Sequence, residues 1–173
     1  MLKQILLNTL IVLILFTSCK TSQKTPQEVV EKLGPDPYFI VDGEPIDKSK
    51  LGNYDPSTIA TLTTFYGKEA KNKYGEIAND GAVVVRTKKF AINIFEDFFS
   101  QYSPEYEEMI TTTEREKIQY ILNGEILKED YEGKLSLLED KTLKGLKVID
   151  SMELKNQFNI DDKEVGVVLK VKE

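Results

Sequence analysis

The feature of this sequence that most restricts its fold is an internal repeat. Residues 39–44 (FIVDGE) reappear 81 positions later as residues 120–125 (YILNGE). Three further matches follow in the same order, with offsets of 84, 84 and 85 residues, and they begin at Thr58, Ala70 and Gly81. Matches that keep their order while the offset changes by a few residues predict two copies of one structural unit with small loop insertions.

Each copy alternates short strand patterns with short helix patterns, which predicts an α+β fold of two tandem units. Each unit is expected to be a small mixed sheet with short helices. In the first copy, Asp55 and Pro56 are typical of a helix start, Gly75 of a helix end and Gly81 of a tight turn. The run 82–87 predicts a central strand buried on both faces. The remaining strands are expected at 38–41, 44–46 and 61–65, and a helix at 68–74.

Two dipeptides at the same place in each copy predict tight turns between strands. They are Asp42-Gly43 in the first copy and Asn123-Gly124 in the second. Glycine accepts a positive φ, and Asp and Asn tolerate one. Asp42 and Glu44 could also be interpreted as a carboxylate pair, but Asn123 replaces Asp42 in the second copy, so the turn is the preferred interpretation.

Between the copies, residues 90–116 predict a helical connector with an apolar face. Ser103 and Pro104 are expected to start its second helix. The aromatic stripe on the first helix predicts core packing that joins the two copies, with a groove for a partner as the alternative; its members are Ile92, Phe95, Phe98, Phe99 and Tyr102. In the second copy we expect strands at 118–122, 146–149 and 165–171 and helices at 129–139 and 152–158.

The N-terminus has the pattern of a secretory signal peptide, which we place at residues 1–18. Lys3 precedes an apolar run at 5–16, and small residues lead to Cys19, the only cysteine in the chain. This run is shorter than the roughly 20 apolar residues that cross a bilayer. Residues 19–35 are largely polar at their start and predict a flexible tether.

The sequence Phe16-Thr17-Ser18-Cys19 resembles the lipobox of bacterial lipoproteins. The resemblance implies cleavage before Cys19, a diacylglycerol on its thiol and acylation of the new amino group with a fatty acid such as palmitate. Several acyl chains hold a protein stably on a membrane, whereas one chain binds weakly. The chain is therefore expected to be a membrane-anchored lipoprotein.

The first copy, placed at residues 36–89, resembles the plug domain of TonB-dependent outer-membrane receptors of the Bacteroidetes type. The resemblance rests on 39–46 (FIVDGEPI), 55–62 (DPSTIATL), Tyr74-Gly75 and 79–88 (NDGAVVVRTK). The second copy, residues 117–173, is a more divergent relative. In that family the plug lies inside a barrel, but too few residues follow position 88 to build a barrel. The resemblance implies a binding or docking module without carrying over any catalytic residue.

The composition disfavours most catalytic mechanisms. The 173-residue chain has no histidine and one cysteine, so Ser-His-Asp catalysis and a cysteine-based zinc site are excluded. Its formal net charge of −6 disfavours nucleic acid as a partner. We expect no cofactor, metal or enzyme activity, and instead an envelope protein as partner, at an outer membrane and facing the periplasm. A periplasmic hydrolase using carboxylates or a Lys-activated Ser is the alternative, and it predicts a pocket with two or more convergent carboxylates of shifted pKa.

Two charged segments remain as weaker candidates for sites. Asp161, Asp162 and Glu164 carry the oxygen ligands of a cation site, although a solvated acidic loop is the preferred interpretation. Tyr66-Gly67-Lys68 and Arg86-Thr87-Lys88 could form a small basic face, although charged strand ends are preferred.

Overall fold

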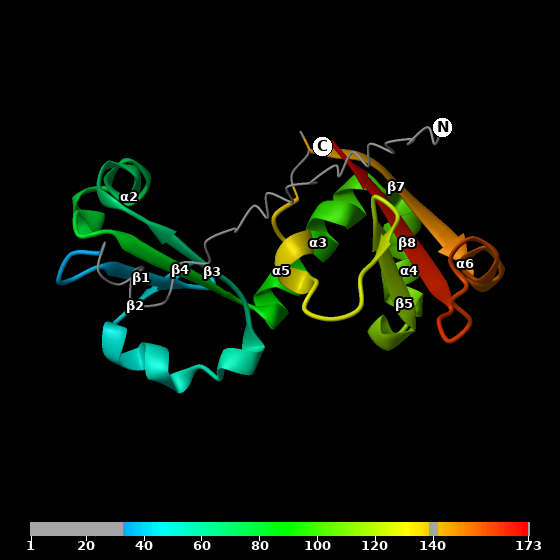
Figure 1. Cartoon of the computed structure of the whole chain (residues 1–173), viewed down its shortest axis with the longest axis horizontal. Helices are drawn as coiled ribbons and strands as arrows, with labels where there is room; N and C mark the ends of the chain where they lie inside the picture. Colours follow the sequence, from blue (N-terminus) through cyan, green and yellow to red (C-terminus); the bar gives the residue numbers. More distant parts are fainter. Residues whose placement is uncertain (1–32, 139–141, 173) are drawn as a thin grey trace, which may run out of the picture.

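The computed structural model describes residues 33–138 and 142–172, and within them the chain forms two four-stranded mixed sheets with short helices (Figure 1). The predicted α+β fold of two small units is confirmed. The strands are β1 (Tyr38–Val41), β2 (Glu44–Ile46), β3 (Ile59–Phe65), β4 (Ala82–Thr87), β5 (Ile118–Leu122), β6 (Glu125–Ile126), β7 (Leu143–Asp150) and β8 (Val165–Val171). The first sheet has the order β2-β1-β4-β3 and the second the order β6-β5-β8-β7.

The two sheets match in direction and register as well as in order. In the first sheet β1 runs parallel to β4, and in the second β5 runs parallel to β8. All other neighbouring strands are antiparallel. Leu62 pairs with Val85, and 84 residues later Leu146 pairs with Leu169. Both edge strands also carry a register shift at the same place, after Ile59 in one and after Leu143 in the other.

This register corrects one detail of the predicted alignment. Gly81 was expected to match Gly166, at an offset of 85 residues. In the sheets, however, Ala82 pairs with Phe65 and Gly166 pairs with Ile149, so the position equivalent to Gly166 is Ala82. Local identity of the two glycines misled the alignment, and a slip of one residue in a strand reverses the face of every side chain.

One face of each sheet is covered by an eight-residue helix that follows the edge strand. These helices are α2 (Gly67–Tyr74) on the first sheet and α6 (Ser151–Phe158) on the second. Ala70 of α2 packs with Ala82 and Ala78, and Leu154 of α6 packs with Ile121 and Ile149. The other helical segments are α3 (Lys88–Tyr102), α4 (Pro104–Thr112), α5 (Glu132–Leu135), η1 (Lys48–Asn53), η2 (Pro56–Thr58), η3 (Glu76–Ala78) and η4 (Arg115–Lys117).

Two of the expected helices differ from the structure. The Asp55-Pro56 start gives only the 3-10 turn η2, which ends at Thr58, and β3 begins at the next residue. The helix expected over 129–139 is wrong in length, because α5 spans only Glu132–Leu135. Asp130 has a φ of 52°, which a right-handed helix cannot include, so α5 starts after it.

The largest hydrophobic core lies on the opposite face of the second sheet, under α3 and α4. Phe95 and Phe99 of α3 and Tyr106 of α4 are fully buried there against Tyr120 and its neighbours. The aromatic stripe is therefore core, as preferred, except for Tyr102, which is 42% exposed, and it packs on the second sheet instead of joining the two sheets.

The two units touch where β3 and β4 meet α5. Lys88 forms an ion pair of 2.6 Å with Asp130, and Arg86 donates a hydrogen bond of 3.1 Å to the carbonyl oxygen of Ser136. A Cβ on Gly133 would lie 2.5 Å from the carbonyl oxygen of Ala60, so only glycine fits at this contact. Among the helices of the described residues, none is long and apolar enough to cross a membrane.

Candidate docking groove on the first unit

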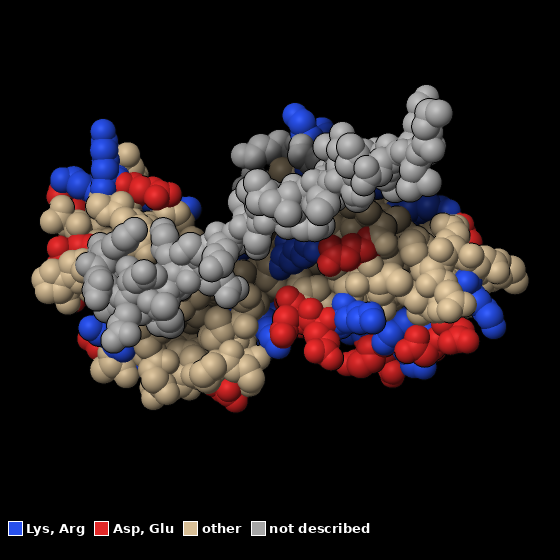
Figure 2. Space-filling model, in the orientation of Figure 1, with Lys and Arg blue, Asp and Glu red and all other residues tan. Residues whose placement is uncertain are grey.

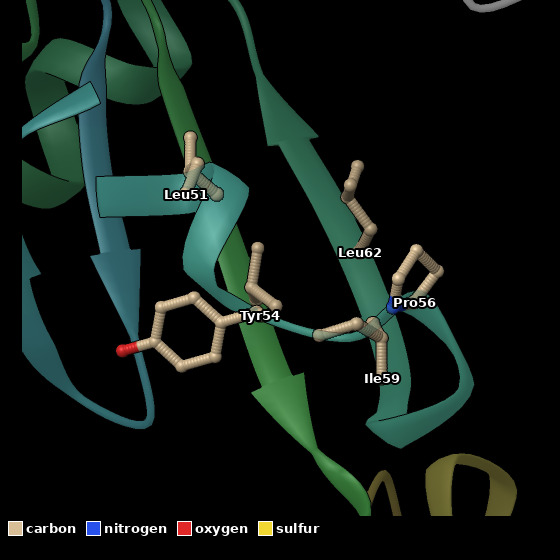
Figure 3. Close-up of a pocket in the computed structure, with 6 residues that line it drawn as sticks. Leu51, Tyr54, Pro56, Ile59 and Leu62 are labelled. Carbon is tan, nitrogen blue, oxygen red and sulfur yellow. The ribbon is translucent and has the colours of Figure 1, made fainter. Parts of the chain in front are cut away.

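An apolar groove lies on the first sheet, on the face opposite α2. It has a volume of about 430 Å³ and lies between η1, η2 and the edge strand β3; its lining residues are Leu51, Tyr54, Pro56, Ile59, Leu62 and Val85. In Figure 3 the side chains of Leu51 and Leu62 extend from η1 and β3 on the two sides of this groove. Leu62 is 60% exposed, an unusual exposure for a leucine in a strand next to a buried core.

The connection between β2 and β3 holds one wall of the groove in place through two capped 3-10 turns. The Asp47 carboxylate accepts a hydrogen bond from the backbone N–H of Ser49 at the start of η1, and Asp55 accepts one from Ser57 at the start of η2. Hydrogen bonds from these serines lower the pKa of both exposed carboxyl groups. The caps keep η1 and η2 formed, so Leu51 and Tyr54 stay packed on the sheet.

The equivalent face of the second sheet is covered. Ile59, Leu62 and Val85 of the groove correspond in register to Leu143, Leu146 and Leu169. Leu143 and Leu169 belong to the large core that includes Tyr106 and Met109 of α4, and Leu146 packs against this core. The two sheets thus have similar apolar faces. The second is covered by α3 and α4, and the first by η1 and Tyr54, which leave Leu62 exposed.

Surface charge also differs between the two units. Figure 2 shows that the part of the first unit that holds η1 and η2 is mainly uncharged, whereas acidic and basic side chains crowd the lower face of the second unit. The edge strand β3 (IATLTTF) has no charged residue, while the equivalent strand β7 carries Lys144 and Lys147. The β3 side of the groove is therefore uncharged, whereas the connection that holds η1 and η2 carries the exposed residues Asp47, Lys48, Lys50 and Asp55. An apolar hollow with polar residues at its rim is typical of a surface that contacts another molecule.

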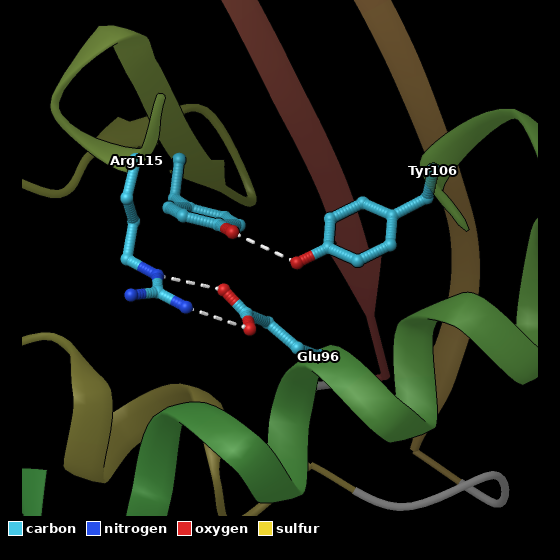
Figure 4. Close-up of polar contacts among 4 residues, drawn as sticks. Glu96, Tyr106 and Arg115 are labelled. Atoms are coloured by element: carbon cyan, nitrogen blue, oxygen red, sulfur yellow. Dashed lines mark hydrogen bonds and ion pairs between the residues drawn. The ribbon is translucent and has the colours of Figure 1, made fainter. Parts of the chain in front are cut away.

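The second unit contains a partly buried polar cluster of two tyrosines, Glu96 and Arg115. The hydroxyl groups of Tyr106 and Tyr120 lie 2.8 Å apart, and Arg115 donates two hydrogen bonds, of 2.8 and 2.9 Å, to the Glu96 carboxylate (Figure 4). Burial raises the pKa of both phenol groups, so both remain protonated at neutral pH. One hydroxyl donates to the other, so each has a hydrogen-bond partner, and packing explains the cluster.

The hydrolase hypothesis requires convergent carboxylates in a pocket. Asp36 and Asp47 line one shallow hollow beside Lys48. The Asp47 carboxylate already caps η1, and hydrogen bonding to Ser49 accounts for its lowered pKa. Among the described residues, no group of three or more carboxylates or cysteines is arranged to hold a metal ion. These observations give the hydrolase hypothesis no support in this part of the chain.

The predicted turn residues hold the two strand pairs in the same way. Asp42 and Gly43 have φ of 53° and 86°, and Asn123 and Gly124 have φ of 49° and 85°. The Asp42 carboxylate accepts hydrogen bonds from the backbone N–H and the hydroxyl of Thr87, at 2.7 and 2.8 Å. At the equivalent place, the Asn123 side-chain oxygen accepts one from the N–H of Val171 at 2.9 Å. Each turn therefore fastens the end of a central strand, which is β4 in the first sheet and β8 in the second.

The remaining predicted residues have structural roles or lie outside the described chain. The Tyr74 ring contacts Tyr38 and Phe65, and burial raises the pKa of its hydroxyl. Gly75 caps α2 with a φ of 82°, and Gly81 precedes β4 with a φ of 102°. Cys19, with the predicted signal peptide and most of the tether, lies outside the described residues.

The two charged segments are used within the fold. Arg86 and Lys88 make the contacts between the units described above, so they do not form a free basic face. In the acidic loop, Glu164 lies 3.5 Å from Lys117, and Lys163 donates to the carbonyl oxygen of Glu116. This loop is fastened to η4, in keeping with the preferred structural interpretation.

Comparison of the chain with protein-family models, with curated proteins and with solved structures gives no match.

The groove residues Leu51, Tyr54 and Leu62 were not identified as a site from the sequence. One signal was available, because the uncharged β3 aligns with a lysine-containing β7.

Proposed function

We propose that this protein is a non-catalytic lipoprotein of the cell envelope that docks a partner protein on the first unit. The observation that carries the docking proposal is the apolar groove beside β3, at a face whose equivalent in the second unit is covered by α4. The anchor is supported by the signal-like residues 1–18 and by Cys19. An outer-membrane location facing the periplasm remains part of the proposal.

The resemblance to TonB-receptor plug domains enters the proposal at the level of the fold. Two of the motif residues that carry it, Asp42 and Thr87, are hydrogen-bonded to each other across β1 and β4. These motif residues therefore have a structural role, because their hydrogen bonds fasten the end of β4 to the turn after β1. We propose a plug-like module that binds a partner protein at its own surface and is not itself a transporter.

The lipid anchor is tested by membrane fractionation and intact mass measurement. In the native host we expect the full-length chain in the membrane fraction, with a mature N-terminus at an acylated Cys19. The Cys19→Ser variant is expected in the soluble fraction or as an unprocessed precursor. Recovery of the unaltered chain from the soluble fraction with an unmodified thiol would contradict the anchor.

Docking is tested by photo-crosslinking in intact cells. A photoreactive phenylalanine replaces the exposed Leu62, and the same residue at Met152, which is 71% exposed on the second unit, serves as the control. We expect an envelope protein to crosslink at position 62 at a yield at least ten times that at position 152. Equal yields at the two positions would refute docking on this groove and leave the anchor untouched.

A further inference from the structure

We infer that residues 25–33 of this chain occupy the groove on the first unit, and that a partner protein has to displace this segment in order to dock. The inference rests on the proposed docking function and adds the regulation of that same site. Residues 25–32 precede the described part of the chain, and Leu33 is its first residue. The occupant is therefore inferred from where the described chain begins and from the residues that lead to it.

The structure shows where this segment meets the first sheet. Leu33 packs on the hydrophobic cluster that contains Val85 of the groove. A Cβ on Gly81 would lie 2.5 Å from Cδ2 of Leu33, so the leucine side chain lies over the start of β4. The N–H of Gly34 donates a hydrogen bond of 2.7 Å to the carbonyl oxygen of Asp80. The chain before β1 is thus fastened to the sheet on the face that carries the groove.

The uncovered part of this face lies within reach of the segment. η1, Tyr54 and Leu33 cover most of the face, and Leu62 remains 60% exposed. Leu62 pairs with Val85, which is four positions beyond Gly81, a distance of about 13 Å along an extended strand. A helix over residues 26–33 is about 12 Å long. A helix that runs back from Leu33 along the sheet therefore reaches the groove.

The sequence before Leu33 predicts a short helix with one apolar side. Thr25 followed by Glu28 forms the capping-box pattern of a helix start, and Pro26 suits the first helical position. The apolar residues recur at the spacings that place them on one side of a helix; they are Pro26, Val29, Val30 and Leu33. The residues between them are polar, so this helix has one side for the groove and one for solvent.

The second unit has a helix at the equivalent place. Helix α4 also begins with a hydroxyl cap and a proline, Ser103 and Pro104, and it contacts β7, the counterpart of β3. Residues 113–117 separate α4 from β5, and residues 34–37 separate Leu33 from β1. Because the order and the spacing agree, the segment is the counterpart of α4 in the first copy.

The segment is held less firmly than α4. Its two valines are smaller than Tyr106 and Met109, which α4 buries, so its packing removes less apolar area from water. The rest of the face is covered without it, so its release exposes Leu62 and leaves the unit folded. A partner that contacts Leu62 therefore competes with the segment for the groove.

The packing is tested by disulfide formation in the full-length chain under mild oxidation. Leu62→Cys is combined with Val29→Cys or Val30→Cys, and with Glu31→Cys as the control on the polar side of the helix. A disulfide requires Cα atoms within about 7 Å. Mass spectrometry of unreduced digests is expected to give at least ten times more intrachain link for one of the valine positions than for Glu31. Leu62→Cys alone shows any pairing with Cys19.

Equal yields from all three pairs, or links between two copies instead of within one, would overturn the inference. Disulfides at position 31 in excess of both valine positions would do the same, because they would place the polar side on the groove.

The regulation is tested by photo-crosslinking from position 62 in cells. Val29→Asp with Val30→Asp loosens the segment, and we expect the yield of partner product to rise at least threefold. Gln27→Asp with Lys32→Asp changes the polar side and is expected to leave the yield unchanged. An unchanged or lower yield from the valine variant would overturn the competition. Thermal unfolding of both variants checks that the units remain folded.

The two proposals fail in different ways. If position 62 gave no more partner product than position 152 in any of these chains, the docking function would fail and its regulation with it. If a partner crosslinked at position 62 while neither valine formed a disulfide with it, docking would stand and the inferred occupant would be wrong.

Discussion

The two units of this protein have one topology and two different surroundings. In the second unit, the face of the sheet formed by Tyr120, Leu169 and their neighbours is buried under α3 and α4. In the first unit, the corresponding face carries η1 and Tyr54 and is otherwise open at Leu62. The comparison indicates that the second copy buries its apolar face under two helices, whereas the first buries most of the same face under η1 and Tyr54 and leaves Leu62 exposed.

The other face of the two sheets shows a different kind of divergence, in which residue sizes change together. The first unit has Ala70 on its helix and Ala82 on its central strand, whereas the second has Leu154 and Gly166 at these places. A larger residue on the helix is accompanied by a smaller one on the strand, as close packing requires. Both units thus keep a filled interior on this side.

The largest expected difference between the units comes from placing a charge on the equivalent leucines. Leu146→Asp puts a carboxylate at a half-buried position against the core of the second unit and is expected to lower the free energy of unfolding by about 3 kcal/mol. Leu62→Asp is expected to change it by less than about 1 kcal/mol, because that side chain is 60% exposed. Urea unfolding of the purified variants, followed by circular dichroism, measures both. Equal losses would show that the first face is covered as well.

The next effect tests the buried tyrosine pair, which the first unit lacks because Phe39 stands in register with Tyr120. Tyr120→Phe leaves the Tyr106 hydroxyl without its partner at 2.8 Å, and we expect a loss of about 1–3 kcal/mol. The double variant Tyr106→Phe with Tyr120→Phe removes both hydroxyls and is expected to recover most of that loss. Thermal unfolding of the single and double variants measures the coupling, and strictly additive losses would contradict it.

A smaller effect is expected at Gly166, which tests the paired change in size. A Cβ there would lie 2.6 Å from Cδ2 of Leu154 and 2.7 Å from Cγ1 of Ile149. Gly166→Ala is expected to cost about 1 kcal/mol, because Cδ2 ends the flexible Leu154 side chain and can shift, whereas Cγ1 of Ile149 lies next to its Cβ and gives less. In a Leu154→Ala background, which resembles the first unit, the same substitution is expected to cost less, because the contact with Ile149 alone remains. An equal cost in both backgrounds, measured by urea unfolding, would refute the packing argument.

Local signals in the sequence were sufficient to predict much of the fold. The Asp42-Gly43 and Asn123-Gly124 turns, the valine run of β4 and the Ser103 cap each depend on neighbouring residues. The groove depends instead on which helices cover a face, and Leu62 and Leu146 occupy equivalent positions in the two sheets although their surroundings differ. The periodicity over 129–139 likewise predicted too long a helix, because Asp130 adopts a positive φ in the bend before α5.

The smallest effect tests whether the two turns are interchangeable. Asp42 accepts two hydrogen bonds from Thr87, and Asn123 accepts one from Val171 with its side-chain oxygen. An Asn at position 42 retains an acceptor oxygen and tolerates the φ of 53°, so Asp42→Asn is expected to change stability by less than about 0.5 kcal/mol. Asp42→Ala loses both hydrogen bonds and the tolerance of positive φ, and should cost about 1–2 kcal/mol. If thermal unfolding gave Asn the same loss as Ala, the carboxylate would have a role in the first unit that its counterpart in the second does not share, and the two turns would not be equivalent parts of one repeat.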